Sequence, residues 1–212
     1  TFSLYYHFQF KIVFLKKNIF MVFQFKIQIK GITKPPVWRK VSVPANFTFL
    51  RFHDVIQTAF GWENYHLFEF KDKEWQSNIR IAVPVEDDFF DPDFFADTKD
   101  SSKIKLSDIF KDKFRKLLYV YDFGDNWVHE ITLESISEDK QKIAICLSGK
   151  GACPPEDCGS IYGHEGMKEV FATEPESEEA DEYREWLGMD EGEMWDTGAF
   201  DLEEINMYLK QV

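Results

Sequence analysis

The sequence predicts an α+β fold: a single domain with an antiparallel β-sheet, helices packed mainly on one face of it, and a helical C-terminal part. Three observations lead to this prediction. Several stretches before residue 150 alternate apolar and polar residues, as half-buried strands do. Short turns containing Gly, Pro, Asp or Asn separate several of these stretches. After residue 160, apolar residues recur at helical spacing, which groups the helices after the strands.

The first strands and the first helix have clear signals. Residues 22–30 alternate Phe and Ile with Gln and Lys, which is typical of a half-buried strand. After Pro35-Pro36, residues 37–43 are its expected partner strand. A helix then begins after Thr48, whose hydroxyl can accept a hydrogen bond from the first turn, and ends at Gly61.

Turn and cap residues also bound the later elements. The expected strands lie at 67–70, 79–83, 117–123, 127–136 and 143–147, and the expected helices lie near 106–110, 166–173, 177–188 and from 201 onward. Ser177 and Asp201 are the expected N-caps of the last two helices, and Glu204 completes a capping-box-like pair with Asp201. The acidic stretch EDDFFDPDFFADTKDSS is expected to be a solvated insertion.

Composition excludes several classes of protein. The chain has 212 residues, which suits one domain with a full core, and its net charge is −13. A general nucleic-acid coat protein needs an excess of Lys and Arg, so this class is excluded and autonomous DNA binding is not expected. Three cysteines leave at least one unpaired and do not make a disulfide framework. They indicate a reducing compartment, and we expect a cytoplasmic location.

The charge is distributed unevenly along the chain. Residues 1–60 carry +8, residues 61–160 carry −8 and residues 161–212 carry −13. Such an asymmetry marks either a partner-binding face or two parts of one fold that screen each other, and the second interpretation is favoured. No apolar run is long enough to span a membrane, so no membrane association is expected.

The first twenty residues are expected to lie outside the domain. Residues 1–20 lack an initiating Met, and Met21 opens the alternating run of the first strand. The segment lacks the features of a signal peptide. We interpret it as an extra strand or as a read-through or tag-like segment, and place the domain at residues 21–212.

The densest group of reactive side chains is YVYDFGDNWVHEI at residues 119–131. Asp122, Asp125 and His129 are candidate catalytic residues, because two carboxylates and an imidazole can bind a divalent metal or serve as acid and base. The structural alternative is favoured: Asp and Asn are turn formers, Gly124 supplies the unusual backbone dihedral, and alternating aromatic residues belong to a core strand.

A second group lies in ACPPEDCGSIYGH at residues 152–164. Cys153, Cys158 and His164, with the remote His129, are candidate ligands of zinc or another divalent metal. Two alternatives remain open: the cysteines form a redox pair, or they are small buried residues beside a rigid Pro-Pro turn.

Further polar and aromatic residues are candidates for a binding groove: Trp38, His66, Tyr121, Trp127, Glu156 and Asp157. Among them, His66 stands beside Leu and Phe, a setting more typical of a packed core histidine than of a ligand. No phosphate-binding Gly-rich loop, nucleophile elbow or His-Glu-x-x-His motif is present in the sequence. A complete catalytic signature is therefore missing, and the sequence favours binding over catalysis.

Four segments together resemble one family: PPVWRKVSVPANFTFLRFHDVIQTAFGWENYHLFEF, YVYDFGDNWVHEI, GACPPEDCGSIYG and AFDLEEINMYL. In this order, and over about residues 22–209, the chain resembles the plasmid Ri (root-inducing) ORF-three-like family. The resemblance implies a single soluble intracellular α+β domain. It implies no reaction, because the family has no established biochemical activity.

Two departures from the family pattern concern the candidate metal site. Residues 159–164 read Gly-Ser-Ile-Tyr-Gly-His instead of continuing with a second Gly and then Gly-Tyr. A His that is common in the family shortly after the His66 position is Phe68 here. A metal site that relied on that His would need a substitute such as His164.

The leading functional hypothesis is a non-enzymatic binding or adaptor domain, with a polar groove built on the YDFGDNWVH turn and the CPPEDCG loop. Its partner would be an unidentified protein or small-molecule ligand, and it would be a monomer or a small homo-oligomer. One alternative is a metal-dependent hydrolase-like enzyme that uses zinc or another divalent cation. The other is an accessory protein in plasmid or mobile-element DNA transactions, in which the basic segment 26–51 contacts phosphate.

Overall fold

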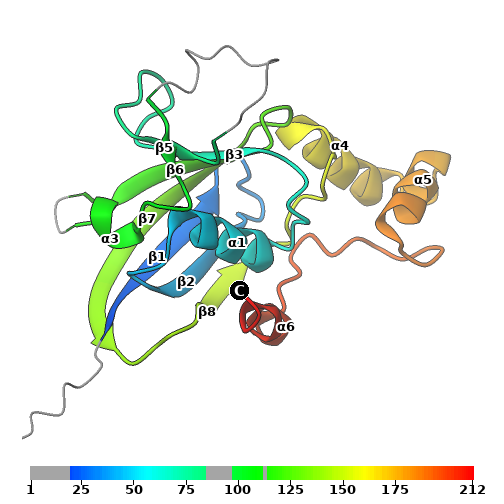
Figure 1. Cartoon of the computed structure of the whole chain (residues 1–212). Helices are drawn as coiled ribbons and strands as arrows, with labels where there is room; N and C mark the ends of the chain where they lie inside the picture. The colour runs from blue at the N-terminus through cyan, green and yellow to red at the C-terminus, as the bar shows by residue number, and fades with distance from the viewer. Residues whose placement is uncertain (1–19, 85–96, 112–113) are drawn as a thin grey trace, which may run out of the picture.

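The computed structural model describes residues 20–84, 97–111 and 114–212, and its centre is one eight-stranded sheet (Figure 1). The strands lie in the order β5-β4-β3-β6-β7-β1-β2-β8. Their bounds are β1 Phe20–Ile29, β2 Trp38–Pro44, β3 Phe68–Lys71, β4 Arg80–Ala82, β5 Lys99–Asp100, β6 Lys116–Tyr121, β7 Trp127–Asp139 and β8 Ile145–Lys150.

The sheet is mixed. Neighbouring strands are antiparallel throughout the described sheet except at one edge, where β4 and β5 run parallel. A parallel pair requires a long connection between its strands, and residues 83–98 are enough chain for one. The expectation of a wholly antiparallel sheet is therefore corrected at this edge, whereas the α+β class is confirmed.

Strand β1 lies between β7 and β2 near the middle of the sheet. Its alternating pattern has the predicted effect: Phe23, Phe25, Ile27 and Ile29 are fully buried on one face. A shift in register between Gln24 and Phe25 on the β7 side marks a bulge.

Helix α1, Phe49–Phe60, lies across the buried face (Figure 1). It begins as predicted, because Thr48 Oγ1 accepts a hydrogen bond from Arg51 N at 3.2 Å. It ends at Gly61, which has a φ of 87°. Phe52 of the helix packs on Phe25 of the sheet with ring centroids 4.9 Å apart, so the core between helix and sheet is largely aromatic.

The other helices are α3 Leu106–Ile109, α4 Ser160–Thr173, α5 Glu178–Leu187 and α6 Leu202–Leu209. Helix α6 packs on β8 and α1. Helices α4 and α5 pack on each other and extend away from the sheet (Figure 1). Ser177 and Asp201 cap α5 and α6 as predicted. Helix α4 begins six residues before its predicted start, directly after the Cys-containing loop.

The strands and helices predicted from residue 22 onward are all present, with shifts of up to six residues at their ends, and β7 continues three residues further than expected. The leader strand predicted in residues 1–20 falls almost wholly outside the described residues, and so does most of the acidic insertion, at 85–96. None of the helices in the described part of the chain has the length and apolar character that a membrane span needs.

Candidate functional site

Three loops that are distant in sequence meet at one end of the sheet. They are residues 61–67 after α1, the β6–β7 turn at 122–126, and residues 151–159 before α4. Trp62 Nε1 donates to the carbonyl of Pro154 at 2.9 Å, which joins the first loop to the third. Gly159 N donates to Asp125 Oδ2 at 3.0 Å, which joins the third loop to the turn. The motifs that suggested chemistry in the sequence therefore lie side by side.

The β6–β7 turn places the Asp122 carboxylate at this junction. Asp122 and Asn126 have φ values of 54° and 55°, in the left-handed region that Asp and Asn tolerate better than most residues. The Asp122 carbonyl accepts from Asn126 N at 2.6 Å, and its Oδ1 accepts from Gly124 N at 2.8 Å. The expectation that Gly124 supplies the unusual dihedral was wrong: Gly124 does not have a positive φ, and Asp122 and Asn126 adopt the left-handed conformation instead.

Glu156 is fixed from two sides. Its Oε1 accepts from the Tyr121 hydroxyl at 2.8 Å and from the backbone N–H of Glu63 at 2.9 Å. The Tyr121 oxygen in turn accepts from Tyr65 N at 3.1 Å. Burial, followed by the hydrogen bond to Glu156, raises the pKa of Tyr121 well above its usual value, so the phenol remains a donor.

A closed hydrogen-bonded ring holds the loop after α1. The Gln57 amide donates to the Tyr119 hydroxyl at 2.9 Å, and His53 contacts that hydroxyl through Nδ1 at 2.8 Å and Asn64 Oδ1 through Nε2 at 2.6 Å. The backbone N–H of Asn64 donates to Gln57 Oε1 at 3.1 Å and closes the ring. Burial lowers the pKa of His53 to about 4, so its imidazole is neutral and Nε2 carries the proton. The ring fixes Asn64, which has a φ of 61°, and so sets the position of His66 two residues later.

His66 faces three carboxylates. Its Nδ1 is 3.8 Å from Asp122 Oδ1, and its Nε2 is 3.1 Å from Asp157 Oδ1 and 3.9 Å from Glu156 Oε2. The side chains of Asp122 and Glu156 are 10% and 15% exposed, whereas that of Asp157 is 67% exposed. We call His66, Asp122, Glu156 and Asp157 the His66 site. It is shielded on the protein side and open to solvent at Asp157.

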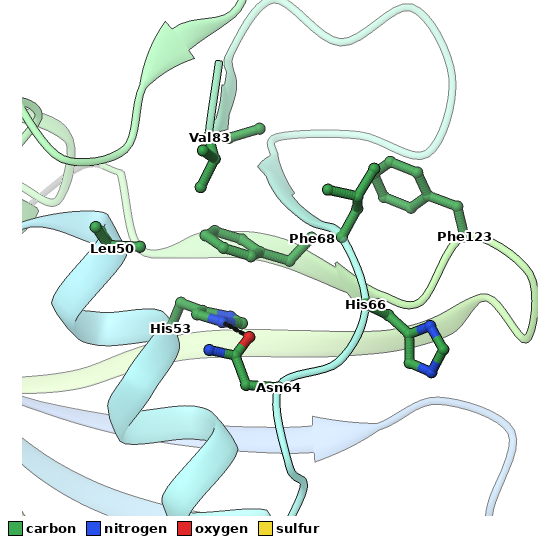
Figure 2. Close-up of a pocket in the computed structure, with 9 residues that line it drawn as sticks. Leu50, His53, Asn64, His66, Phe68, Val83 and Phe123 are labelled. Carbon is green, nitrogen blue, oxygen red and sulfur yellow. Dashed lines mark hydrogen bonds between the residues drawn. The ribbon is translucent and has the colours of Figure 1, made fainter. Parts of the chain in front are cut away.

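An apolar pocket of about 190 Å³ lies next to the His66 site (Figure 2). Its apolar lining consists of Leu50, Leu67, Phe68, Ala82, Val83 and Phe123, and its polar lining consists of His53, Asn64 and His66. The ring of Phe68 stacks on the imidazole of His53, with ring centroids 3.6 Å apart. In Figure 2 the His66 ring lies at the edge of this group and points away from Leu50 and Val83. His66 is therefore shared between the pocket and the carboxylates.

The three catalytic candidates do not converge. Asp122 belongs to the His66 site, but Asp125 holds Gly159 N, and His129 is fully buried in the core. Strand alternation explains this, because His129 shares the inward face of β7 with Trp127. Its Nδ1 donates to Trp127 O at 3.1 Å, and burial lowers its pKa to about 3. His129 is a neutral core residue.

The four metal-ligand candidates are not brought together either. His129 lies in the core, and His164 packs on Trp195 with ring centroids 5.5 Å apart. Burial raises the pKa of Cys153 well above its usual value and that of Cys158 to about 12, so both are thiols. Across residues 20–84, 97–111 and 114–212, the one group of three His, Cys, Asp or Glu ligand atoms within 4.8 Å of one another comes from His66, Asp122 and Asp157.

Four of the six groove candidates meet here: His66, Tyr121, Glu156 and Asp157. Trp38 lies on the opposite face of the sheet, where Lys26 Nζ is 5.4 Å from its ring centroid. Trp127 is 1% exposed and packs on Trp62 in the core. Sequence reasoning missed Asn64 and the apolar lining. The GWENYHLFEF segment at residues 61–70 carried a signal for Asn64, Leu67 and Phe68, because its polar residues interrupt an apolar run.

Two basic residues of the segment 26–51 are engaged within the fold. Lys40 pairs with Glu134 at 2.8 Å. Arg39 is 3% exposed, and its guanidinium donates to the carbonyls of Ala59, Lys150 and Gly151 at 2.8–3.0 Å. The positive charges of Lys40 and Arg39 are therefore both occupied by groups of the protein itself.

Three matches with known proteins show what this chain is similar to. A model of the family described as plasmid pRiA4b ORF-3-like protein matches residues 21–204. The uncharacterized protein y4hQ of Sinorhizobium fredii (strain NBRC 101917 / NGR234) is 31% identical over 175 residues, which cover 82% of this chain and 83% of y4hQ. The crystal structure of the protein of unknown function MM3350 from Methanosarcina mazei Go1 is similar, with a TM-score of 0.72 and 38% identity over 87% of this chain and 96% of that one.

Proposed function

The chain belongs to the plasmid pRiA4b ORF-3-like family, and from this premise we propose that it is a ligand-binding domain whose recognition site combines the His66 site with the adjoining apolar pocket. The ligand is a compact molecule or side chain with one apolar end and one polar end. The observation that carries this proposal is the position of His66, which lines the pocket and also lies 3.1 Å from the Asp157 carboxylate. An apolar and a charged surface thus share one residue.

The pocket sets the size of the apolar end. A cavity of roughly 150 Å³ lined by Leu, Ile and Phe side chains accepts benzene, so about 190 Å³ suits one aromatic ring or a short branched alkyl group. The lining is mostly apolar with a few placed polar atoms, which is the composition of ordinary small-molecule sites. The ring of hydrogen bonds through His53 and Asn64 holds this lining in place before a ligand arrives.

The carboxylates set the character of the polar end. Asp122, Glu156 and Asp157 surround a single imidazole, so the site carries an excess of negative charge. It therefore attracts a cation, either an organic ammonium group on the ligand or a metal ion that the ligand then contacts.

Three probes with the same ring test this proposal: benzylamine, benzyl alcohol and benzoate. Each is titrated at millimolar concentration into isotopically labelled protein, with and without added Zn²⁺. We expect at least one probe to shift the NMR signals of Leu50, Phe68 and Phe123 in a saturable manner. A Val83→Trp variant should block binding by filling the pocket, because Val83 lines it.

The matched control is Ile143→Trp, which adds the same bulk at a remote position of similar exposure, 38% against 39% for Val83. If no probe shifts these signals in either condition, or if Val83→Trp binds as well as the control, the proposal is wrong.

A further inference from the structure

We infer that the His66 site coordinates a divalent transition-metal ion through His66, Asp122 and Asp157. This inference rests on the proposed binding function and specifies its polar half. None of these residues belongs to the metal-ligand set His129, Cys153, Cys158 and His164 suggested by sequence. Asp122 was a catalytic candidate, and His66 and Asp157 were groove candidates.

The spacing of the ligand atoms is close to what one ion requires. A zinc-sized ion binds imidazole nitrogen and carboxylate oxygen at about 2.0–2.2 Å, so two ligand atoms on the same ion lie at most about 4.3 Å apart. The atoms offered by His66, Asp122 and Asp157 all lie within 4.8 Å of one another. Small side-chain rotations complete the coordination, and the exposed Asp157 is free to make the largest one.

A buried polar atom of His66, the ring nitrogen Nε2, supplies an independent reason. Nε2 is shielded from solvent and makes no hydrogen bond to any described residue, although Asp157 Oδ1 is 3.1 Å away. A buried polar atom without a partner costs about 1–3 kcal/mol. Its neighbours are acceptors, so a metal ion satisfies both the imidazole lone pair and the carboxylate charge.

The donor set selects the class of metal. One imidazole and two carboxylates suit Zn²⁺, Co²⁺, Mn²⁺ or Fe²⁺, whereas Ca²⁺ and Mg²⁺ prefer all-oxygen sites. Glu156 stays outside this set. Its Oε1 is already occupied by Tyr121 and Glu63, and its Oε2 lies 3.9 Å from His66 Nε2, where it can accept a hydrogen bond from a water on the ion.

Three protein ligands leave coordination positions open, as in sites where a metal binds a further ligand. The protein side of the site is closed by Asp122 and Glu156, its open side faces solvent at Asp157, and His66 also lines the apolar pocket. The polar end of the bound ligand is therefore a metal-coordinating anion such as a carboxylate. Of the three probes, benzoate should bind best, and only when the metal is present.

The test is titration of chelator-treated full-length protein with Co²⁺, followed by its visible absorption, and with Zn²⁺ by calorimetry. We expect one equivalent of each metal. Asp122→Asn, Asp157→Asn and His66→Ala should each weaken binding at least about tenfold. Glu169→Gln is the matched control, because it removes one exposed carboxylate on α4 and should leave affinity unchanged.

This experiment distinguishes a folding defect from a loss of metal binding. Asp157 is exposed, so its substitution leaves the packing intact, and circular dichroism checks the other variants. Binding of neither metal, or unchanged affinity in Asp157→Asn and His66→Ala, overturns the inference. Metal-independent binding of benzylamine would overturn it too, yet would leave the proposed ligand-binding function standing. Metal binding without binding of any probe would support the metal site and would show that the proposed ligand-binding function is wrong.

Discussion

The hydroxyl of Tyr121 donates a hydrogen bond of 2.8 Å to Glu156, a residue 35 positions later in the chain. The bond joins the last residue of β6 to the loop before α4, and Glu63 N joins the same carboxylate oxygen from the loop after α1. The Glu156 carboxylate thus links three segments that frame the His66 site: the end of β6, the loop after α1 and its own loop before α4. The neighbouring Asp157 is placed by the same loop.

Tyr121→Phe should loosen this junction. The variant leaves Tyr65 N without its acceptor and removes one of the two donors to Glu156, so we expect a loss of about 1–3 kcal/mol in the free energy of unfolding. Urea denaturation measures the loss. Tyr162→Phe is the control, because Tyr162 is 88% exposed and should change stability by less than about 0.5 kcal/mol. Equal effects in the two variants would show that the hydroxyl of Tyr121 does not stabilise the junction.

Asp122 should respond differently to Asn and to Ala. Asn tolerates the φ of 54° and its amide oxygen can still accept from Gly124 N, so Asp122→Asn should be close to wild type in stability. Ala loses the acceptor and is strained at this φ, so Asp122→Ala should cost about 1–3 kcal/mol. Thermal unfolding of both proteins separates these cases. A stable Ala variant would mean that the turn does not need the side chain.

Much of the fold could be predicted because its signals are local. The alternation in β1, the Thr48 cap and the Gly61 end of α1 each depend on a few neighbouring residues, and each was found as predicted. The parallel pairing of β4 with β5 was not predictable, because β5 is only two residues long and has no periodic pattern. Its position comes from pairing with β4 and not from its own sequence.

The site was predicted in part, for a physical reason. Reactive residues on turns, such as Asp122, Glu156 and Asp157, were recognised because turns expose side chains. His129 stayed a candidate beside the favoured structural interpretation, because position along the sequence does not show which strand face is buried until the sheet is paired. His66 was recognised, but its carboxylate neighbours come from two other loops, and no spacing in the sequence shows that closeness.

Stability should fall between pH 7 and pH 5.5. His53 and His129 are buried as neutral imidazoles with pKa values near 4 and 3, while the pKa of histidine in the unfolded chain is about 6.5. Below pH 6.5 the unfolded state therefore binds more protons than the folded state does. The free energy of unfolding keeps its full value above that pH and declines as the pH falls toward 4. Between pH 7 and pH 5.5, we expect each buried histidine to lower the free energy of unfolding by about 1 kcal/mol.

Urea denaturation at several pH values measures this loss, and variants identify its source. His129→Phe removes one of the titrating groups, so its stability should decline by about 1 kcal/mol less than that of the wild type over the same interval. His53→Gln should show a similar reduction independently. If the pH dependence is the same in both variants as in the wild type, these histidines do not cause it.

Arg39 should be intolerant of replacement even by Lys. Its guanidinium donates to the carbonyls of Ala59 at the end of α1, of Lys150 at the end of β8 and of Gly151 after it. One ammonium group cannot reproduce this set of directions. We expect Arg39→Lys to lose at least about 2 kcal/mol and Arg39→Met about 3–5 kcal/mol in unfolding free energy. Arg51→Lys, at an exposed position, is the control and should change little. A mild Arg39→Lys variant would contradict the assigned hydrogen bonds.

Two glycines in α4 should give opposite results when changed to Ala. A Cβ on Gly163 would overlap the carbonyl oxygen of Cys158, a backbone atom that can move only if the Cys-containing loop moves. A Cβ on Gly166, one turn later, meets nothing within 4 Å. Gly163→Ala should therefore destabilise the protein by more than about 1 kcal/mol. Gly166→Ala should stabilise it by up to about 1 kcal/mol, because Ala is the better helix former.

The pair also tests the connection between α4 and the His66 site. The loop that carries Cys158 also carries Glu156 and Asp157, so a displacement of Cys158 should be transmitted to both carboxylates. Gly163→Ala should thus weaken Co²⁺ binding as well as stability, whereas Gly166→Ala should leave the affinity unchanged. Because both variants add one methyl group to the same helix, a difference between them isolates the contact with Cys158. Identical metal affinity in the two would show that the loop holds its carboxylates independently of α4.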